Sequence, residues 1–361
     1  MKKYAAIALC TSAILAGCNS SNTSNEPKKE KTVQEQPKKQ EKKVQSQGKI
    51  SWSPITHEST NTTIHMTDIK DSLTEVQYQI WRTADGKESS KLFTSKEKDK
   101  QFTIPFDVKE FEGKRGEYQI EATGVKENGK NIPLTTSSIV FEQHVPILMY
   151  HAIEDYYGQG IKDLFVSPAN FEAQMQYLKE NGYTLLTFER WNDINKVNKP
   201  IFVTFDDGMK NNMNAFHILK KLKDDTFKPT ATEYMIVDNI DAEGSLSTAD
   251  IKEMVDSGIF SVQSHTATHA DLPKITNYEG ELKNSKDKLK KITGKPVIAI
   301  AYPFGHVNDK VVEETKKYYQ FATTTKPGQF ITKSETDELL KIKRVRMHHS
   351  TTVEQFGLAI K

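Results

Sequence analysis

Two adjacent carboxylates, Asp206 and Asp207, follow a short apolar run in this 361-residue chain. The run, residues 201–203, is typical of a buried strand, and Gly208 follows the acidic pair. Neighbouring buried carboxylates lose hydration and repel each other, so they persist where a cation or a proton offsets their charge. The pattern therefore predicts Asp207 as a metal ligand and Asp206 as a general base. The alternative is a plain strand followed by an Asp-Gly turn.

Two histidines follow a second predicted strand in the same way. Residues 259–262 predict the strand, and His265 and His269 come after it, four positions apart. If this segment is helical, both imidazoles lie on one face and can reach one ion. One carboxylate and two imidazoles leave coordination positions open, which is typical of catalytic metal sites. We expect Asp207, His265 and His269 to bind Zn²⁺, with Co²⁺ or Ni²⁺ as alternatives of the same geometry.

A third strand, residues 299–301, ends in a Tyr-Pro-Phe-Gly segment that by itself is an ordinary strand end. Together and in this order, the three segments resemble the motifs of the polysaccharide deacetylases, the NodB-homology carbohydrate esterases of family four. The resemblance covers roughly residues 145–361: 204–208, 265–269 and 301–305 match the first three motifs. Residues 146–151 resemble the opening strand of many members.

The resemblance implies a set of roles for particular residues. Asp206 would take a proton from water, and the backbone N–H of Phe304 would share the oxyanion with the metal. A histidinium at His348 would protonate the leaving nitrogen, and His349 is the rival for that role. His348 also follows a charged strand that can be a plain polar edge.

The chain departs from the family pattern at two places. The family often has an arginine, which orients the catalytic aspartate, at the position of Ala301. A fourth motif containing Asp and Trp has no counterpart between residues 321 and 340. From charge alone, we hypothesise that Arg344 or Arg346 replaces the missing arginine by pairing with Asp206.

Other polar and aromatic residues near the motifs are candidates for lining a substrate cleft. His151 follows the first strand of the resembling region, and a role in the core is the alternative for it. The other candidates are Tyr302, Pro303 and His349. Aromatic side chains beside a cleft are also common in packing, so the same alternative applies to Tyr302.

The first 48 residues are typical of an export signal and a tether. Lys2 and Lys3 precede an apolar stretch, residues 5–16, which is too short to span a bilayer. Residues 15–18, Leu-Ala-Gly-Cys, resemble a bacterial lipobox, which implies removal of residues 1–17 and a diacylglycerol on Cys18. The alternative is an ordinary secretory signal. Residues 18–48 are polar and predict a disordered tether. We expect a lipid-anchored protein on the outer face of a bacterial cell membrane.

Two folded regions are predicted after the tether. Residues 49–143 contain short alternating segments with turn signals, which predict an all-β sandwich of immunoglobulin or fibronectin type III kind. Residues 144–361 alternate strands and helices, which predicts an α/β region with a parallel sheet. By resemblance, this region is a distorted, incomplete (β/α) barrel. The motifs all fall at the carboxyl ends of predicted strands, where barrel enzymes build their sites.

Composition and motifs together reduce the number of function classes that fit this chain. The formal net charge is only +2 and basic residues do not cluster with aromatics, so nucleic-acid binding has little support. The sequence names no protein partner. We expect a metal-dependent hydrolase that removes N-acetyl groups from cell-envelope polysaccharide, first of all from N-acetylglucosamine of peptidoglycan. Poly-N-acetylglucosamine and chitin oligomers are the next substrates. The rival is a non-catalytic wall-binding lipoprotein on a decayed esterase scaffold.

Overall fold

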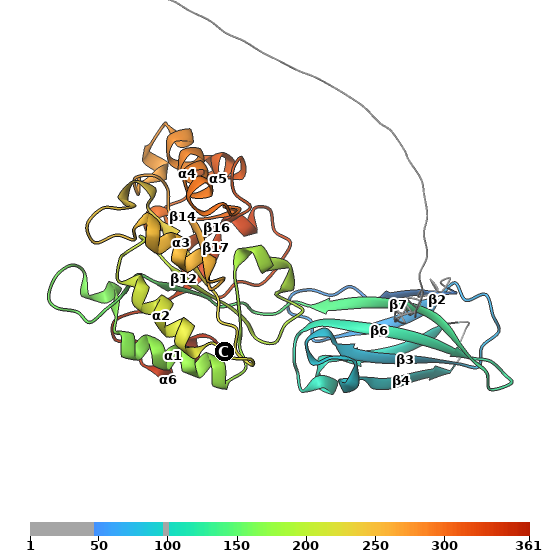
Figure 1. Ribbon diagram of the computed structural model, residues 1–361. Coiled ribbons are helices and arrows are strands. Elements are labelled where there is room, and N and C mark those ends of the chain that lie inside the picture. Colours follow the sequence, from blue (N-terminus) through green and yellow to red (C-terminus); the bar gives the residue numbers. More distant parts are fainter. Residues whose placement is uncertain (1–46, 97–100) are drawn as a thin grey trace, which may run out of the picture. The chain divides into compact units, whose positions relative to one another are not determined.

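The computed structural model describes residues 47–96 and 101–361 (Figure 1). The predicted signal segment, Cys18 and the tether up to residue 46 lie outside these residues. Residues 47–48 were predicted as the end of the tether, but the backbone N–H of Gln47 donates to the carbonyl of Leu134 (3.0 Å). The last two residues of the predicted tether therefore attach to the strands that follow.

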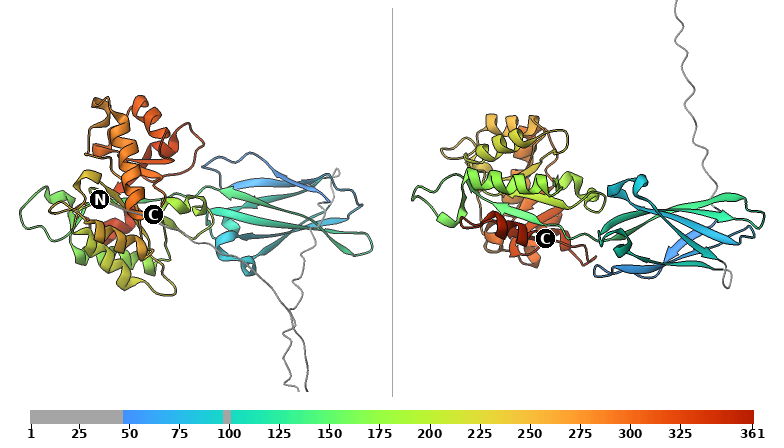
Figure 2. Two further views of the ribbon diagram at one scale, coloured as in Figure 1. Left: turned by 45° about the horizontal axis from the view of Figure 1, so that its top comes forward. Right: turned by 90° about the horizontal axis from the view of Figure 1, so that it is seen from below.

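Residues 47–96 and 101–143, the β lobe, form two antiparallel sheets with strand orders β1-β2-β5 and β4-β3-β6-β7. The strands are β1 Lys49–Trp52, β2 Asn61–Thr67, β3 Glu75–Arg82, β4 Lys91–Lys96, β5 Phe102–Asp107, β6 Gly116–Val125 and β7 Asn131–Phe141. Figure 2 shows long strands in this lobe. The alternating segments behind the prediction, residues 62–66, 76–80, 101–104 and 118–122, fall in β2, β3, β5 and β6, whereas β1, β4 and β7 were not predicted.

Alternation of apolar and polar residues produces these strands. Every second residue of β3 is buried, as expected for a strand with one face on a core. Ile64 and Ile104 from one sheet and Ile80 and Tyr118 from the other belong to a single buried cluster. The two sheets thus share one hydrophobic core, and the immunoglobulin or fibronectin type III assignment stays a prediction.

Residues 144–361, the barrel lobe, contain a closed barrel of seven parallel strands, β8 and β12 to β17, with β11 added beside β12. The strands are β8 Ile147–Tyr150, β11 Thr184–Leu186, β12 Pro200–Phe205, β13 Ala231–Met235, β14 Phe260–Ser264, β15 Ala299–Ala301, β16 Phe321–Pro327 and β17 Ile342–Arg346. Two further short strands, β9 Ala152–Ile153 and β10 Phe165–Val166, pair with each other. The predicted barrel is present, and it closes because β8 pairs with both β12 and β17.

Helices cover the outside of the barrel (Figure 1). They are α1 Pro168–Glu180, α2 Asn212–Leu222, α3 Thr248–Asp256, α4 Asn284–Thr293, α5 Asp309–Lys316 and α6 Val353–Ala359. The first begins at Pro168, because the Ser167 side chain accepts from the N–H of Asn170 and caps the helix. The described residues contain no helix with the length and apolar character needed to cross a membrane.

The barrel interior changes from apolar to polar along its axis. Trp191, carried by the 3-10 helix η5 Phe188–Asp193, packs on Phe202 and Phe321 in a buried aromatic cluster. Toward the carboxyl ends of the strands, the buried side chains include Thr204 and Arg344. This polar end is where the predicted site residues emerge from the strands.

Candidate metal and catalytic site

Asp207, His265 and His269 come together at the carboxyl-terminal end of the barrel. One ligand atom from each residue lies within 4.8 Å of the others. Oδ1 of Asp207 is 3.5 Å from Nε2 of His265 and 3.7 Å from Nε2 of His269. Zinc binds nitrogen and oxygen ligands at about 2.0–2.2 Å, so two ligands at a tetrahedral angle lie roughly 3.3–3.6 Å apart. The spacing and the donor set therefore fit a divalent metal.

The two histidines do not share a helical face, as the sequence analysis supposed. Residues 265–271 form an irregular loop, in which Thr266 (φ 68°) and His269 (φ 63°) have left-handed backbones. The Glu281 carboxylate accepts from the backbone N–H groups of Ala267 (3.0 Å) and Thr268 (2.9 Å) and fixes this loop. Strained backbone held in place by its surroundings is frequent at functional sites. The i, i+4 spacing thus singled out two histidines that the structure does bring together, but not through a shared helical face.

The third motif orients His265 through its backbone. Nδ1 of His265 lies 2.8 Å from the carbonyl oxygen of Ala301, which can only accept, so Nδ1 carries the proton. The other nitrogen, Nε2, then faces Asp207 with a free lone pair, as a metal ligand requires. Burial would lower the pKa of His265, but the hydrogen bond and charges of Asp207 and Asp206 raise it. Although residue 301 is an alanine, its backbone carbonyl accepts the hydrogen bond that fixes the tautomer of His265.

Asp206 forms an ion pair with Arg344, which is one of the two arginines predicted to pair with it. Nη1 and Nη2 of Arg344 donate to Oδ1 and Oδ2 of Asp206, each at 2.7 Å. Both side chains are buried, and Nε of Arg344 also donates to the carbonyl of Thr324 (3.0 Å). Burial raises the pKa of Asp206, but the charge and hydrogen bonds of Arg344 outweigh it and hold that pKa below its usual range. Arg346 does not pair with Asp206, and its charge acts on Asp163 instead.

We expect Arg344→Ala to destabilise the protein by about 3–5 kcal/mol, because it leaves the buried Asp206 carboxylate without its partner. Deacetylation should fall with it, since Asp206 loses its orientation. Arg346→Ala is the matched control on the same strand and should change the free energy of unfolding by less than about 1 kcal/mol. Urea unfolding and acetate release measure the two effects. Unaltered activity and stability in Arg344→Ala would exclude the pairing as a functional feature.

A buried carboxyl that the sequence analysis missed, Glu233, lies on β13 behind the metal-binding turn. Its Oε1 accepts from Nδ2 of Asn212 (3.1 Å), at the start of α2. Burial raises the pKa of Glu233 well above its ordinary value, and the charges of Asp206 and Asp207 act in the same direction. Oε2 of Glu233 and Oδ1 of Asn212 are both buried without a hydrogen-bond partner among the described residues. The only sequence signal of Glu233 is a charged residue inside the strand of residues 231–237.

His151 is placed beside the carboxylates. Tyr150 and Phe205 are paired in the sheet, so the next residues, His151 and Asp206, leave neighbouring strands together. Burial lowers the pKa of His151, whereas the charges of Asp206 and Asp207 raise it. His151 thus follows β8 at the same end of the barrel as Asp206. The role of His151 in lining a substrate pocket stays a prediction.

The two candidate acids near the end of the chain have other partners. Nδ1 of His348 lies 2.7 Å from Oδ2 of Asp163, and His348 is exposed. Asp163 belongs to the 3-10 helix η4 Lys162–Leu164, and its pKa is lowered chiefly by the hydrogen bond to His348. Nδ1 of His349 lies 3.0 Å from the carbonyl oxygen of Phe165. The structure thus attaches both histidines to the segment around β10.

Phe304 lies next to the metal ligands. It has a left-handed backbone (φ 61°) in the 3-10 helix η9 Pro303–Gly305, and its side chain is 55 % exposed. Its ring centroid is 4.6 Å from that of His269, and its carbonyl accepts from Oγ1 of Thr325 (3.2 Å). The turn is therefore fixed beside the site, and the oxyanion role of its backbone N–H stays a prediction.

Two predicted lining residues are wrong for that role. Tyr302 is completely buried in the main core of the barrel lobe, and Pro303 is also buried. Neither side chain can therefore contact a substrate at the surface. The apolar strand β15 continues into the core through Tyr302 before the chain turns outward at Phe304. Packing, the alternative given for Tyr302, is what the structure shows.

Comparisons with known proteins identify relatives of this chain. Residues 193–320 match the family described as "Polysaccharide deacetylase". The crystal structure of a polysaccharide deacetylase from Bacillus cereus is 83% identical to this chain, covers 88% of it and 100% of its own chain, and has a TM-score of 0.86. The Streptococcus pyogenes deacetylase PplD, in complex with acetate, is 30% identical, with a TM-score of 0.54 over 61% of this chain and 99% of its own.

A third relative has a named substrate. The poly-beta-1,6-N-acetyl-D-glucosamine N-deacetylase of Staphylococcus aureus is 29% identical over 181 residues, which are 44% of this chain and 60% of that protein. This chain therefore spans only part of that relative. The Bacillus cereus structure, by contrast, is matched over its full length and at high identity. The chain belongs to the polysaccharide deacetylase family and is an enzyme of that family.

Proposed function

We propose that this protein is a metal-dependent N-deacetylase of an envelope polysaccharide that contains N-acetylglucosamine. One observation carries the proposal: the ligand trio Asp207, His265 and His269 lies beside an aspartate, Asp206, that a buried arginine holds ionised. A decayed scaffold has no need to keep a buried ion pair next to three well-spaced ligands. This favours the enzyme over the non-catalytic wall-binding lipoprotein.

Different residues of the chain have different roles in amide hydrolysis. Asp207, His265 and His269 would hold a divalent metal, which would supply Lewis-acid chemistry that lowers the pKa of water and polarises a carbonyl. Asp206 accepts the proton of the attacking water with a lone pair that Arg344 leaves free, because each carboxylate oxygen has two. The backbone N–H of Phe304 would stabilise the negative charge that develops on the acetyl oxygen.

The position of His151 makes it our choice as proton donor to the departing amine, in place of His348. The charges of Asp206, Asp207 and His265 all act on His151. Because burial lowers the pKa of His151, the ring is mainly neutral at neutral pH, and the proton that it passes to the amine is the one that the attacking water gives up to Asp206. His348 instead forms its hydrogen bond with Asp163, at the segment around β10.

We expect His151→Ala to lower amide deacetylation by about 10²–10⁴-fold, the usual contribution of a general acid or base. His348→Ala should lower it less than tenfold. With 4-nitrophenyl acetate, whose leaving group needs no proton, His151→Ala should retain most of its activity. Steady-state rates on N-acetylated oligosaccharide and on the ester measure the difference. A larger loss in His348→Ala on the amide substrate would return the role to His348.

The substrate proposal needs a direct comparison of glycans. Peptidoglycan N-acetylglucosamine is our first choice, since a lipid-anchored enzyme with a tether would work close to the wall. Poly-β-1,6-N-acetylglucosamine is the second choice, supported by the name of the Staphylococcus aureus relative, and chitin oligomers are the third. Acetate release from equal concentrations of the three glycans decides among them. Release from none of them, with metal present, would favour the non-catalytic alternative.

We also propose that the protein is anchored by lipid at Cys18, on the outer face of the bacterial membrane. The support is the sequence alone: Lys2 and Lys3, the short apolar stretch and the Leu-Ala-Gly-Cys segment. A diacylglycerol carries two acyl chains, enough for stable anchoring. Cys18→Ala should block lipidation and leave an uncleaved or differently cut product, visible by gel shift and membrane fractionation. Unmodified wild-type protein found mainly in the culture medium would contradict the proposal.

A further inference from the structure

Glu233 occupies a face of β13 that is otherwise apolar. Alternate residues of a strand share one face, so Glu233 lies on the same face as Ala231 and Met235. These two residues belong to the main hydrophobic core of the barrel lobe, and Glu233 is completely buried as they are. A buried carboxyl group costs free energy unless hydrogen bonds compensate for its lost hydration. An apolar side chain would fill this place in the core, so the polar atoms of Glu233 require their own explanation.

Strand register places Glu233 beside the first motif. In the parallel pair of β12 and β13, Glu233 is the partner of Phe205. Asp206 and Asp207 directly follow Phe205, so the turn that carries the proposed metal ligand Asp207 begins level with Glu233. Glu233 is therefore close in the sheet to the point where this turn leaves β12.

The metal-binding turn, residues 206–212, has an unusual backbone. Asp207 (φ 76°) and Gly208 (φ 70°) are both left-handed. A Cβ atom at position 208 would clash with Cε of Met235, so a larger residue does not fit there against β13. A left-handed aspartate persists where surrounding contacts hold it in place. The position of the Asp207 carboxylate therefore depends on the groups that fix this turn.

Backbone hydrogen bonds fix one side of the turn. The carbonyl of Gly208 accepts from the N–H of Leu246 (2.9 Å), and the N–H of Lys210 donates to the carbonyl of Gly244 (2.9 Å). Both partners lie in the segment that leads into α3. These bonds attach the turn to a loop and not to the barrel strands.

Glu233 attaches the turn to the barrel. Its Oε1 accepts from Nδ2 of Asn212 (3.1 Å), and the backbone N–H of Asn212 donates to the carbonyl of Met209 (3.0 Å). The backbone N–H of Gly208 also acts on the Glu233 carboxyl group by hydrogen bonding. Asn212 and Glu233 are completely buried, so water does not compete for their hydrogen bond. The carboxyl group of Glu233 thus joins the turn to β13.

The strand β13 lies between the strands that lead to two of the proposed ligands. It pairs with β12, which precedes Asp207, and with β14, which precedes His265. On the side of β14, the backbone N–H of His265 donates to the carbonyl of Met235 (2.8 Å). On the side of β12, the link to the turn is made by Glu233. The separation of 3.5 Å between Oδ1 of Asp207 and Nε2 of His265 therefore depends on both attachments.

We propose that Glu233 is a positioning residue of the metal site: through Asn212, it holds the turn of Asp207 at the distance from His265 that one ion requires. Glu233 is not one of the three ligands. It acts on the metal only through the place that it gives to Asp207. The proposal rests on the proposed metal-dependent function. Loss of a group that orients a metal ligand costs roughly 10–100-fold in metal affinity, and we expect an effect of this size.

Glu233 fills this role as a hydrogen-bonding group rather than as a charge. Burial raises the pKa of Glu233 well above its ordinary value, and the charges of Asp206 and Asp207 act in the same direction. A neutral carboxyl group keeps the acceptor oxygen that Asn212 needs. Glutamine has the same shape and also keeps an acceptor, so Glu233→Gln is the conservative variant. Methionine is of similar size but only a weak acceptor, so Glu233→Met removes the hydrogen bond and keeps the core filled.

The zinc affinity of the whole protein, measured by competition with a chromophoric chelator, tests the proposal. We expect the zinc Kd of Glu233→Gln to stay within about threefold of the wild type. Glu233→Met should raise that Kd about tenfold or more. The double variant Glu233→Met/Asn212→Leu replaces both buried polar partners by apolar groups, so its metal-free stability toward urea should match or exceed that of the wild type. Its zinc affinity should still be low, which a purely structural pair would not cause.

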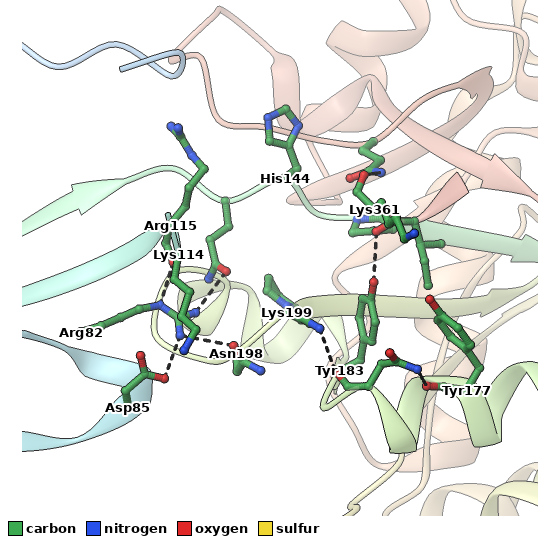
Figure 3. Close-up of a pocket in the computed structure, with 16 residues that line it drawn as sticks. Arg82, Asp85, Lys114, Arg115, His144, Tyr177, Tyr183, Asn198, Lys199 and Lys361 are labelled. Atoms are coloured by element: carbon green, nitrogen blue, oxygen red, sulfur yellow. Dashed lines mark hydrogen bonds and ion pairs between the residues drawn. The ribbon is translucent and has the colours of Figure 1, made fainter. Parts of the chain in front are cut away.

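A control variant lies at the other end of the same strand (Figure 3). Oδ1 of Asn198 accepts from Nη1 of Arg82 (3.3 Å), and Nδ2 of Asn198 donates to the carbonyl of Gly182 (2.9 Å). Asn198 comes just before β12, which begins at Pro200, whereas Asp207 follows the opposite end of that strand. Asn198→Ala should therefore lower the free energy of unfolding and leave the zinc affinity unchanged.

The results that would overturn the proposal differ from those that would overturn the metal site. Wild-type zinc affinity in Glu233→Met and in the double variant would show that Glu233 does not position Asp207. Equal losses in Glu233→Gln and Glu233→Met would exclude hydrogen bonding as its role. An equal loss in Asn198→Ala would mean that zinc affinity only follows stability. A wild-type protein that binds no zinc would overturn the ligand assignment itself, and this proposal with it.

Discussion

Replacing His265 by alanine is expected to remove the bound metal and to lower the deacetylase activity at least 10³-fold, while the barrel stays folded. The ring is one of three ligands whose donor atoms lie within 4.8 Å of one another. Loss of one ligand from a three-residue site leaves too few protein donors for tight binding. The effect is larger than that of a general acid or base, because water activation and carbonyl polarisation disappear together. Metal content by mass spectrometry and acetate release measure the two losses.

The neighbouring Thr268→Ser offers a control in the same loop. Its hydroxyl and backbone N–H both contact Glu281, and serine retains these donors. Metal content should therefore match that of the wild type. Circular dichroism should show the same thermal transition in His265→Ala and in metal-depleted wild type. Full metal occupancy in a His265→Ala/His269→Ala double variant would refute the ligand assignment.

Asp206→Asn should keep the metal and lose about 10²–10⁴-fold in turnover, because it deletes the proposed base and leaves the three ligands. Asp207→Asn should instead lose metal first. The change at Asp206 also removes a buried charge pair with Arg344, so stability will fall as well. The activity of the variant should therefore be measured well below its melting temperature. Equal metal contents in Asp206→Asn and Asp207→Asn would contradict this division of roles.

The pH dependence of stability gives a second readout for Asp206. Arg344 holds the pKa of Asp206 below its usual range despite burial. A carboxyl whose pKa is lowered by folding stabilises the protein above its unfolded pKa, about 3.9, and loses that contribution as the pH falls further. The wild type should therefore lose stability below about pH 4 more steeply than Asp206→Asn. Parallel urea titrations at pH 7 and below pH 4 measure the difference.

The sequence by itself predicted the α/β class of the barrel lobe and three candidate metal ligands, whose ligand atoms lie within 4.8 Å of one another in the structure. Asp207 follows Asp206 at the end of β12, and His265 follows β14. Parallel strands bring their carboxyl ends to one edge, so both side chains lie at that edge. The β lobe was predicted from alternation, although β7, which carries many threonines and serines, was missed. The polar strand β16 was missed for the same reason, because Thr323 to Thr325 show no apolar period.

Only the tertiary structure decided the contacts made over long separations in the chain. Charge allowed Arg344 and Arg346 equally as partners of Asp206, and the closure of the barrel at β17 selected Arg344. The conformation of the histidine loop depends on Glu281, and the proximity of His151 to Asp206 depends on the pairing of β8 with β12. Local sequence fixes which face a residue takes on its own strand. The side chain that this residue contacts across the barrel depends on barrel closure and on strand register. Strands from the whole lobe contribute to both.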